Sequence, residues 1–246
     1  MSDFLLLLAI GFFAQLVDGA LGMAFGVLST TAMLTMGFPP ALASAVVHTA
    51  EVFTTGASAA SHIYHRNVDW RLVAKLGIAG VLGAILGAWI LSNVDVTAAR
   101  RYVYVYLLLM GLYILYKSTR LSPPRETAAG WTPPLGFVAG FLDASGGGGW
   151  GPMTTSTLLG AGHAPRQTVG SVNAAEFFVT VAAATTFFIE LGLSPLSHLL
   201  PLVLGGVLAA PFGGGAVKRV SPRFLMRGVG LLIVALSVYQ LFRLLR

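Results

Sequence analysis

Four acidic residues stand inside long apolar stretches of this sequence. Asp18 and Asp143 each precede a glycine-rich stretch, and Glu51 and Glu176 each lie within an apolar run. Burying a carboxyl group in such surroundings is unfavourable in free energy. One interpretation is that the group carries protons or contacts a substrate. For the two aspartates the alternative is structural, because an aspartate before a helix break can accept hydrogen bonds from the N–H groups that the break leaves free. The sequence leaves both interpretations open.

His48 and Asn173 lie three residues before the two glutamates, so each pair shares one face of a helix. Histidine changes its charge near neutral pH, which makes these patches candidates for proton coupling. The alternative is a pair of hydrogen-bonding groups that only join helices. The residues predicted to couple protons are Asp18, His48, Glu51, Asp143 and Glu176.

The stretches Gly19–Gly26 and Ala144–Pro152 interrupt two apolar segments. Each glycine inside a helix costs roughly 1 kcal/mol relative to alanine, and Pro152 has no N–H group, so we expect both helices to break. The N-terminus of a helix presents free N–H groups with positive partial charge, and two such ends facing each other would bind an anion. The alternative is that these glycines only allow close packing, as expected of Gly83 and Gly87 in a GxxxG spacing. Neither stretch is followed by the Lys-Ser or Lys-Thr of a nucleotide-binding loop.

Polar groups around the two breaks complete the predicted substrate site. They offer either a backbone N–H group at a break or a side chain able to hydrogen-bond an anion. Scattered Ser and Thr residues have a simpler alternative role, as packing contacts between membrane helices. The predicted substrate-binding residues are Gln15, Gly22, Gly26, Ser29, Thr30, Gly147, Gly148, Gly149, Gly151, Thr154, Thr155 and Asn173.

Other kinds of function find little support. The chain has no cysteine, which excludes disulfides, thiolate nucleophiles and cysteine metal sites. His62 and His65 lack a convincing ligand spacing, so we predict no metal site and no cofactor. No nucleophile is paired with a base, so an enzyme is not indicated. The chain has a net charge of +6, and its basic residues lie in short connections, which argues against nucleic-acid binding.

Several tyrosines between residues 102 and 116 are interpreted as interfacial anchors.

The chain repeats itself at an offset of 125 residues. Residues 11–26 read GFFAQLVDGALGMAFG and residues 136–151 read GFVAGFLDASGGGGWG, which align without a gap. Identical pairs continue beyond this motif and include Pro40/Pro165, Glu51/Glu176 and Phe53/Phe178. A bias toward glycine and alanine would not pair these residue types, so we infer a duplication. The predicted repeats are residues 1–124 and 125–246, joined by a proline-containing linker at about residues 117–133.

The composition predicts an all-α polytopic membrane protein. Hydrophobic residues make up 56% of the chain, charged residues 10%, and the mean hydropathy is +0.80, whereas soluble domains are about a quarter charged. Continuous apolar runs, rather than alternating strands, favour helices. Each repeat is predicted to contain a glycine-broken or re-entrant first segment and three transmembrane helices. The runs fall at about residues 4–34, 41–63, 73–92, 102–116, 134–159, 165–191, 196–212 and 224–242.

Lysine and arginine distinguish two topologies. If all eight segments cross, the basic residues divide eight to seven and give no orientation. If the first and fifth segments are re-entrant, eleven fall on one side and only Arg100, Arg101, Arg243 and Arg246 on the other. This bias predicts a cytoplasmic linker with both termini outside. Three crossings per half make the repeats inverted, with a site near the midplane; eight crossings, the alternative, make them parallel.

The sequence resembles the sulfite exporter TauE/SafE family over essentially its whole length. The resemblance is carried by AQLVDGALGMAFGVLSTTAML and GFPPALASAVVHTAEVFTTGASAASHI in the first repeat, and by GGGGWGPM and GSVNAAEF in the second. It implies a multi-pass permease of the bacterial cytoplasmic (inner) membrane that exports a small sulfur-containing or organic anion, such as sulfite or sulfoacetate. A proton-linked mechanism is what the resemblance leads us to expect.

The sequence-based hypothesis is therefore a secondary transporter that works by alternating access. Its expected partners are a small anion and the lipid bilayer, and a homo-oligomer is left open. The alternative is a passive anion channel or uniporter, in which the same anion site would act as a filter.

Overall fold

A computed structural model describes residues 2–21, 23–119, 131–161, 163–193, 196–216 and 221–245, except the side chains of residues 2, 19–21, 165, 196–197, 210–216 and 222. These residues form ten helices and no strand. The helices of the first half are α1 (Ser2–Leu21), α2 (Phe25–Thr35), α3 (Pro40–Tyr64), α4 (Trp70–Asn93) and α5 (Val96–Thr119). Those of the second half are α6 (Thr132–Gly146), α7 (Trp150–Gly160), α8 (Pro165–Leu191), α9 (Leu196–Ala216) and α10 (Pro222–Leu244).

The helices begin at residues suited to helix starts. Pro40 opens α3 at a position where its missing N–H group has no intrahelical partner to lose. Asp69 caps α4, because its carboxylate accepts hydrogen bonds from the N–H groups of Arg71 (2.9 Å) and Leu72 (3.4 Å). Ser221 caps α10 in the same way. The predicted apolar segments therefore become helices with bounds only a few residues wider.

Both predicted helix breaks are present. The first segment breaks between Leu21 and Phe25, and the fifth between Gly146 and Trp150. Gly147, Gly148 and Gly149 have φ angles of 79°, 134° and 146°, which a side chain rarely tolerates. The chain therefore leaves the helix where glycine allows it.

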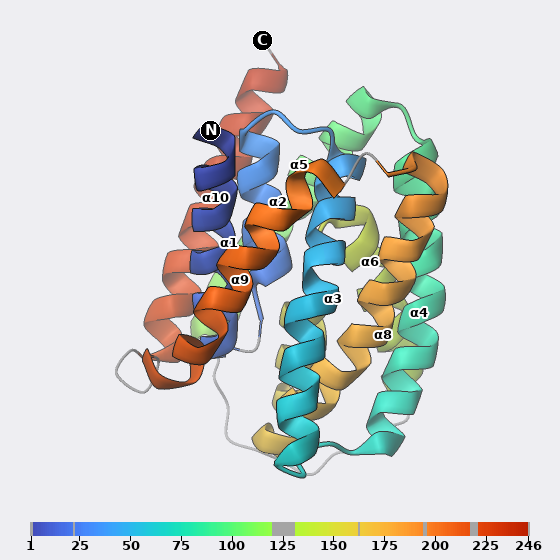
Figure 1. Cartoon of the computed structure of the whole chain (residues 1–246), viewed down its shortest axis with the longest axis vertical. Coiled ribbons are helices and arrows are strands. Elements are labelled where there is room, and N and C mark those ends of the chain that lie inside the picture. The colour runs from blue at the N-terminus through green and yellow to red at the C-terminus, as the bar shows by residue number, and fades with distance from the viewer. Residues whose placement is uncertain are drawn as a thin grey trace.

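The first broken segment folds back on itself. The N-terminus and the connection from α2 to α3 lie at the same end of the molecule, which is also the end of the C-terminus (Figure 1). The α1–α2 pair therefore enters and leaves at one end. The α6–α7 pair starts at the opposite end, because α6 runs parallel to α4: Gly136 packs on Leu76, and Gly87 packs on Phe141.

Small residues let the two halves interlock. A Cβ atom at Gly83 would meet the backbone carbonyl of Phe137, so α4 and α6 pack backbone to backbone. This contact confirms the close packing predicted for the GxxxG pair. Helices α1 and α9, the repeat counterparts of α6 and α4, pack in the same way, with Gly11 against Leu202 and Gly205 against Leu8. Helices α3 and α5 pack against their own counterparts, α8 and α10.

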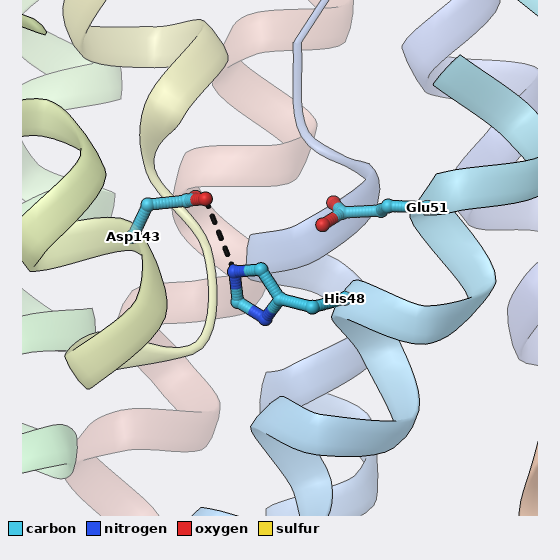
Figure 2. Close-up of side chains that lie close together, drawn as sticks. All are labelled: His48, Glu51 and Asp143. Carbon is cyan, nitrogen blue, oxygen red and sulfur yellow. Dashed lines mark hydrogen bonds and ion pairs between the residues drawn. The ribbon is translucent and has the colours of Figure 1, made fainter. Parts of the chain in front are cut away.

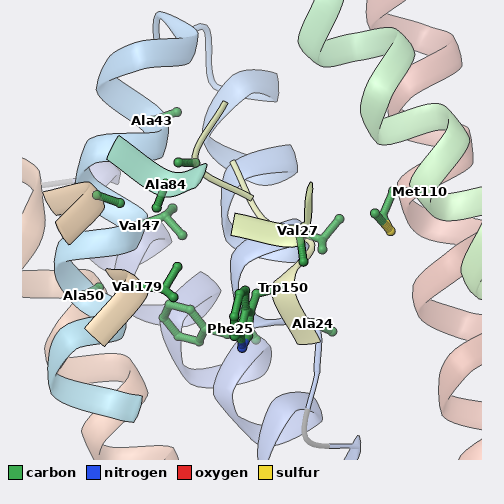
Figure 3. Close-up of a cluster of buried hydrophobic side chains, with 14 of the residues drawn as sticks. Ala24, Phe25, Val27, Ala43, Val47, Ala50, Ala84, Met110, Trp150 and Val179 are labelled. Atoms are coloured by element: carbon green, nitrogen blue, oxygen red, sulfur yellow. The ribbon is translucent and has the colours of Figure 1, made fainter. Parts of the chain in front are cut away.

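In the described part of the chain, four helices are long and apolar enough to cross a membrane by length and composition: α4, α5, residues 166–191 of α8 and residues 223–244 of α10. Large apolar side chains such as Leu82, Leu109 and Leu231 stand exposed on their outer faces. Buried apolar residues fill the interior, where Phe25 and Trp150 of the two broken segments belong to one cluster (Figure 3). Apolar residues both inside and outside identify a helical membrane protein. The predicted boundary between the repeats, after residue 124, lies outside the described residues.

Candidate functional site

The two helix breaks meet inside the molecule. A Cβ atom at Gly148 would collide with the backbone of Gly26 and Val27, at the first turn of α2. A Cβ atom at Gly26 would stand 2.8 Å from Oε1 of Glu51 and 2.9 Å from Cα of Gly148. At Gly147 it would meet the side chain of Thr30. Glycine is therefore needed here for contact between the breaks as well as for backbone conformation.

Each aspartate caps the helix that follows its break. Oδ1 of Asp143 accepts a hydrogen bond from the Trp150 N–H group (2.8 Å). Oδ1 of Asp18 accepts one from the Phe25 N–H group (3.3 Å), at the repeat-related position. The structural interpretation of the two aspartates is thus realised. A role in carrying protons is compatible with it, since each carboxyl has a second oxygen.

His48 joins the first half to the second break. Its Nε2 lies 3.1 Å from Oδ2 of Asp143, and the two side chains are 0% and 3% exposed (Figure 2). Its Nδ1 donates to the backbone carbonyl of Ser44 (2.8 Å), because a carbonyl can only accept. The contact between Nε2 and Oδ2 therefore needs a proton on one of these two atoms. Ser44 adds a second link by donating its hydroxyl to the Ala144 carbonyl (2.8 Å).

A small cavity lies where the breaks meet. Four carboxyl side chains line it, those of Asp18, Glu51, Asp143 and Glu176, together with the first turns of α2 and α7. Its volume is about 10 Å³, which is room for about one water molecule. No lysine or arginine is among its lining residues. The site is thus small, strongly acidic and bordered by two helix N-termini, which leave N–H groups of their first turns without intrahelical acceptors.

Glu51 has a buried carboxyl oxygen, Oε2, that lacks a hydrogen-bond partner among the described residues. Its carboxyl faces that of Asp143 across the cavity (Figure 2). Thr54 and Thr55 also line the cavity, although the sequence analysis did not select them. Their positions three and four residues after Glu51, on the same helix face, were the available signal.

The predicted substrate residues fall into four groups. Gly26, Gly149 and Gly151 line the cavity, and Gly147 and Gly148 pack against α2. Gly22 lies outside the described residues. The remaining predicted residues are buried but do not line this cavity: Gln15, Ser29, Thr30, Thr154, Thr155 and Asn173.

These buried residues have different surroundings. The Thr154 hydroxyl donates to the Trp150 carbonyl (2.6 Å). Asn173 donates to the Val169 carbonyl and accepts from the hydroxyl of Ser58 (3.2 Å). Among these six residues, those with a buried side-chain oxygen that has no hydrogen-bond partner in the described part of the chain are Gln15, Ser29, Thr30 and Thr155.

Tyr106 is a site residue that the sequence did not reveal. Interpreted as an interfacial anchor, it instead lies buried against the second break. Its hydroxyl donates to the Gly148 carbonyl (2.7 Å), and its ring lies where a side chain of Gly146 would stand. An aromatic residue in an apolar run carries no signal for such a contact, so the anchor interpretation was wrong for this tyrosine.

Three side chains of the site also meet the distance requirement for a metal ion. Ligand atoms of His48, Glu51 and Asp143 all lie within 4.8 Å of one another. The second ring nitrogen of His48 is held by a carbonyl, as is usual for a metal-binding histidine. Spacing along the chain does not bring Asp143 near the other two, so no metal site could be predicted here from the sequence.

Comparisons with known proteins place this geometry in a family. The family described as "Sulfite exporter TauE/SafE" matches residues 7–240. The "Probable membrane transporter protein YtnM" of Bacillus subtilis (strain 168) is 43% identical over 241 residues, covering 94% of this chain and 80% of that protein.

A "Probable membrane transporter protein" of Haemophilus influenzae is 27% identical over 165 residues, which is 63% of each chain. No solved structure matches this chain. The extent of the family match and the close bacterial relative lead to one conclusion. The chain is a membrane transporter that belongs to the sulfite exporter TauE/SafE family.

Proposed function

We propose that this protein is a secondary transporter that exports a small sulfur-containing or organic anion across the bacterial cytoplasmic membrane, linked to protons, by alternating access. The observation that carries the proposal is the small acidic cavity where the two breaks meet. It combines two helix N-termini, which attract an anion, with four carboxyl groups, which exchange protons. Sulfite, sulfoacetate and related anions are the proposed substrates, in keeping with the family name.

The charge of the cavity supports proton linkage. An anion that enters it meets Asp18, Glu51, Asp143 and Glu176, and no lysine or arginine lines the cavity to offset them. Repulsion between unscreened charges is strong in an apolar interior. An oxyanion therefore binds beside these acids only while they hold protons, and the hydrogen bonds of protonated carboxyls then favour it. Binding of the anion and binding of protons become mutually dependent.

The size of the cavity supports alternating access. Room for about one water molecule is too little for a sulfite ion, which has a sulfur and three oxygens. The halves must therefore separate at the breaks before the anion can enter. A passive channel would need an open path in at least one stable state.

The arrangement of the halves supports an inverted topology. The described basic residues near the helix ends opposite the termini are Arg66, Arg71, Lys75, Lys117, Arg166, Arg223 and Arg227, and those at the end of the termini are Arg100, Arg101 and Arg243. By the positive-inside rule, this excess favours a cytoplasmic position for the richer end. Broken helices that enter from opposite ends and meet near the midplane are what inverted repeats provide.

The test is flux of radiolabelled sulfite and sulfonates in proteoliposomes, with and without an imposed pH gradient. In the wild-type protein the gradient is expected to drive flux. Glu51→Gln and Glu176→Gln remove one exchangeable proton each while keeping the shape of the side chain, so they should uncouple flux from the gradient. Glu190→Gln is the matched control, because Glu190 is an exposed acid on the same helix as Glu176.

Each result has a distinct meaning. Uncoupling by the two cavity variants but not by Glu190→Gln supports proton-linked transport. Flux that ignores both the gradient and the cavity variants points to a channel or uniporter. If a cavity variant disappears from the membrane, its carboxyl is needed for folding, and flux of the other variant decides.

A further inference from the structure

A second polar pocket lies at the end of the molecule that carries both termini. It forms where the beginning of α5, the end of α10 and the end of α2 meet, and its volume is about 160 Å³. Figure 1 shows the end of α10 and the end of α2 on the same side as the N- and C-termini. The residues that line it include Thr35, Arg100, Tyr104, Tyr239, Gln240 and Arg243.

Two guanidinium groups serve this pocket. Nε of Arg100 is buried and has no hydrogen-bond partner within the described chain. The guanidinium of Arg243 lies over the ring of Tyr239, 5.9 Å from its centroid. Neither arginine forms an ion pair with a carboxylate of the described residues, and no acid lines the pocket. Two positive charges that share an uncompensated pocket attract an anion.

The floor of the pocket is fixed in position. The side-chain amide of Gln240 on α10 donates to the hydroxyl of Thr35 (2.6 Å) and to the carbonyl of Thr31 (3.3 Å), both on α2. The hydroxyl of Thr35 in turn donates to the Thr31 carbonyl (2.8 Å). These bonds hold α10 against α2, so the two arginines face a preformed space.

The pocket has no counterpart in the other half. At the offset of 125 residues, Arg100 and Tyr104 correspond to Leu225 and Val229, and Arg243 corresponds to Ser118. The basic groups therefore serve one side of the membrane only. They are also exceptions to the charge bias, which otherwise gathers basic residues at the opposite end. A binding role explains why two arginines lie at this end, against the bias.

We propose that Arg100 and Arg243 form an outer binding site for a small oxyanion of the sulfite or sulfonate class. The inference rests on the proposed function and deepens it: the anion occupies this pocket on the side of the termini, and the acidic cavity inside holds it only together with protons. A guanidinium group matches an oxyanion with two parallel hydrogen bonds, and the volume accommodates a sulfite or sulfonate group. The phosphate of an anionic lipid has the same chemistry, so the test must separate the two.

The test is calorimetric titration of sulfite and methanesulfonate into the purified full-length protein in a neutral detergent. Arg100→Gln and Arg243→Gln are each expected to weaken binding by about tenfold or more, since each removes hydrogen bonds to a charged group. Arg101→Gln is the matched control, because Arg101 is the neighbouring arginine but lines a different, apolar groove. Arg100→Lys keeps the charge and loses the paired donors, so it should fall between wild type and Arg100→Gln.

Three outcomes would overturn the proposal. The first is equal affinity in wild type, Arg100→Gln and Arg243→Gln, with all proteins monodisperse. The second is equal weakening by Arg101→Gln, which would indicate only general charge. The third is that phosphatidylglycerol abolishes anion binding, whereas free anions do not displace the lipid. That result would assign the pocket to a lipid headgroup.

The result is separable from the proposed transport function. If Arg100→Gln leaves binding unchanged while the Glu51 and Glu176 variants uncouple flux, only the outer site fails. If the titrations succeed but no anion is transported in proteoliposomes, the binding site stands and the proposed transport fails.

Discussion

The two helix breaks occupy repeat-related positions, and an aspartate caps the second helix of each. They differ in how many side chains hydrogen-bond to them. At the first break Asp18 accepts one hydrogen bond, 3.3 Å long, from the helix that follows. At the second, Asp143 accepts the corresponding bond at 2.8 Å and also contacts His48. Tyr106 adds a bond to the Gly148 carbonyl.

The residues that make the difference are not duplicated. At the offset of 125 residues, His48 corresponds to Asn173 and Tyr106 to Leu231. Duplication therefore supplies the cap at both breaks, and later divergence supplies the extra bonds at the second. Substitutions at equivalent positions should then have unequal effects, with the second break the more sensitive.

Removing the capping aspartates should show the largest inequality. Asp143→Ala leaves the His48 ring and the Trp150 N–H group buried without their partner, so it should destabilise the protein by about 3 kcal/mol. Asp18→Ala leaves only one N–H group without its partner and should cost about 1 kcal/mol. Thermal unfolding in detergent, followed by size-exclusion chromatography, measures both. Equal losses would mean that the His48 contact contributes nothing.

The residue before each second helix gives the next contrast. Gly149 has a φ of 146°, and a Cβ atom there would meet the hydroxyl of Tyr106, so Gly149→Ala should cost about 2 kcal/mol. The first break already has Ala24 at this position, with a φ of 119°. Ala24→Gly should change stability by less than about 1 kcal/mol, because relief of backbone strain opposes the loss of a buried methyl group. A large loss of stability on Ala24→Gly would show that packing of the methyl group contributes more than relief of backbone strain.

Exchanging the unequal residues tests function as well as stability. His48→Asn gives the first half the residue of the second and removes the imidazole that contacts Oδ2 of Asp143. Because the contact between Nε2 of His48 and Oδ2 of Asp143 needs a proton, transport by this variant should depend less on pH than transport by wild type. The reverse change, Asn173→His, is the control for an added imidazole. An unchanged pH profile for His48→Asn would assign the pH dependence to the carboxyls alone.

The sequence was most informative where a residue type forces a local structure. The glycines before Phe25 and Trp150 predicted both breaks, and the aspartates before those glycines gave capping as one of two open interpretations. It was least informative about which side of a helix faces the cavity. The broken helices are apolar around most of their surface, so no stripe indicates that Gly26 lines the cavity while Ser29 does not.

Long-range contacts could not be predicted for a different reason. His48 and Asp143 are 95 residues apart, and Tyr106 and Gly148 are 42 residues apart. Spacing along one helix says nothing about such pairs. Likewise, the positions of Arg100 and Arg243 along the chain do not indicate a shared pocket. The packing of α5 against α10 brings them together.

Tyr106→Phe is the mildest test of the inequality between the breaks. The variant keeps the ring that packs on Gly146 and removes only the hydroxyl, so the Gly148 carbonyl loses its donor in a buried place. We expect a loss of about 1 kcal/mol, the usual value of one neutral hydrogen bond. Tyr102→Phe is the control, since the Tyr102 hydroxyl bonds the Ser145 side chain nearby, leaves the break itself untouched and is partly exposed. Leu231, which corresponds to Tyr106 at the offset of 125 residues, has no hydroxyl. A loss for Tyr106→Phe that exceeds that of Tyr102→Phe would therefore assign the extra stability of the second break to this phenol. Equal losses would leave His48 as the residue that distinguishes the two breaks.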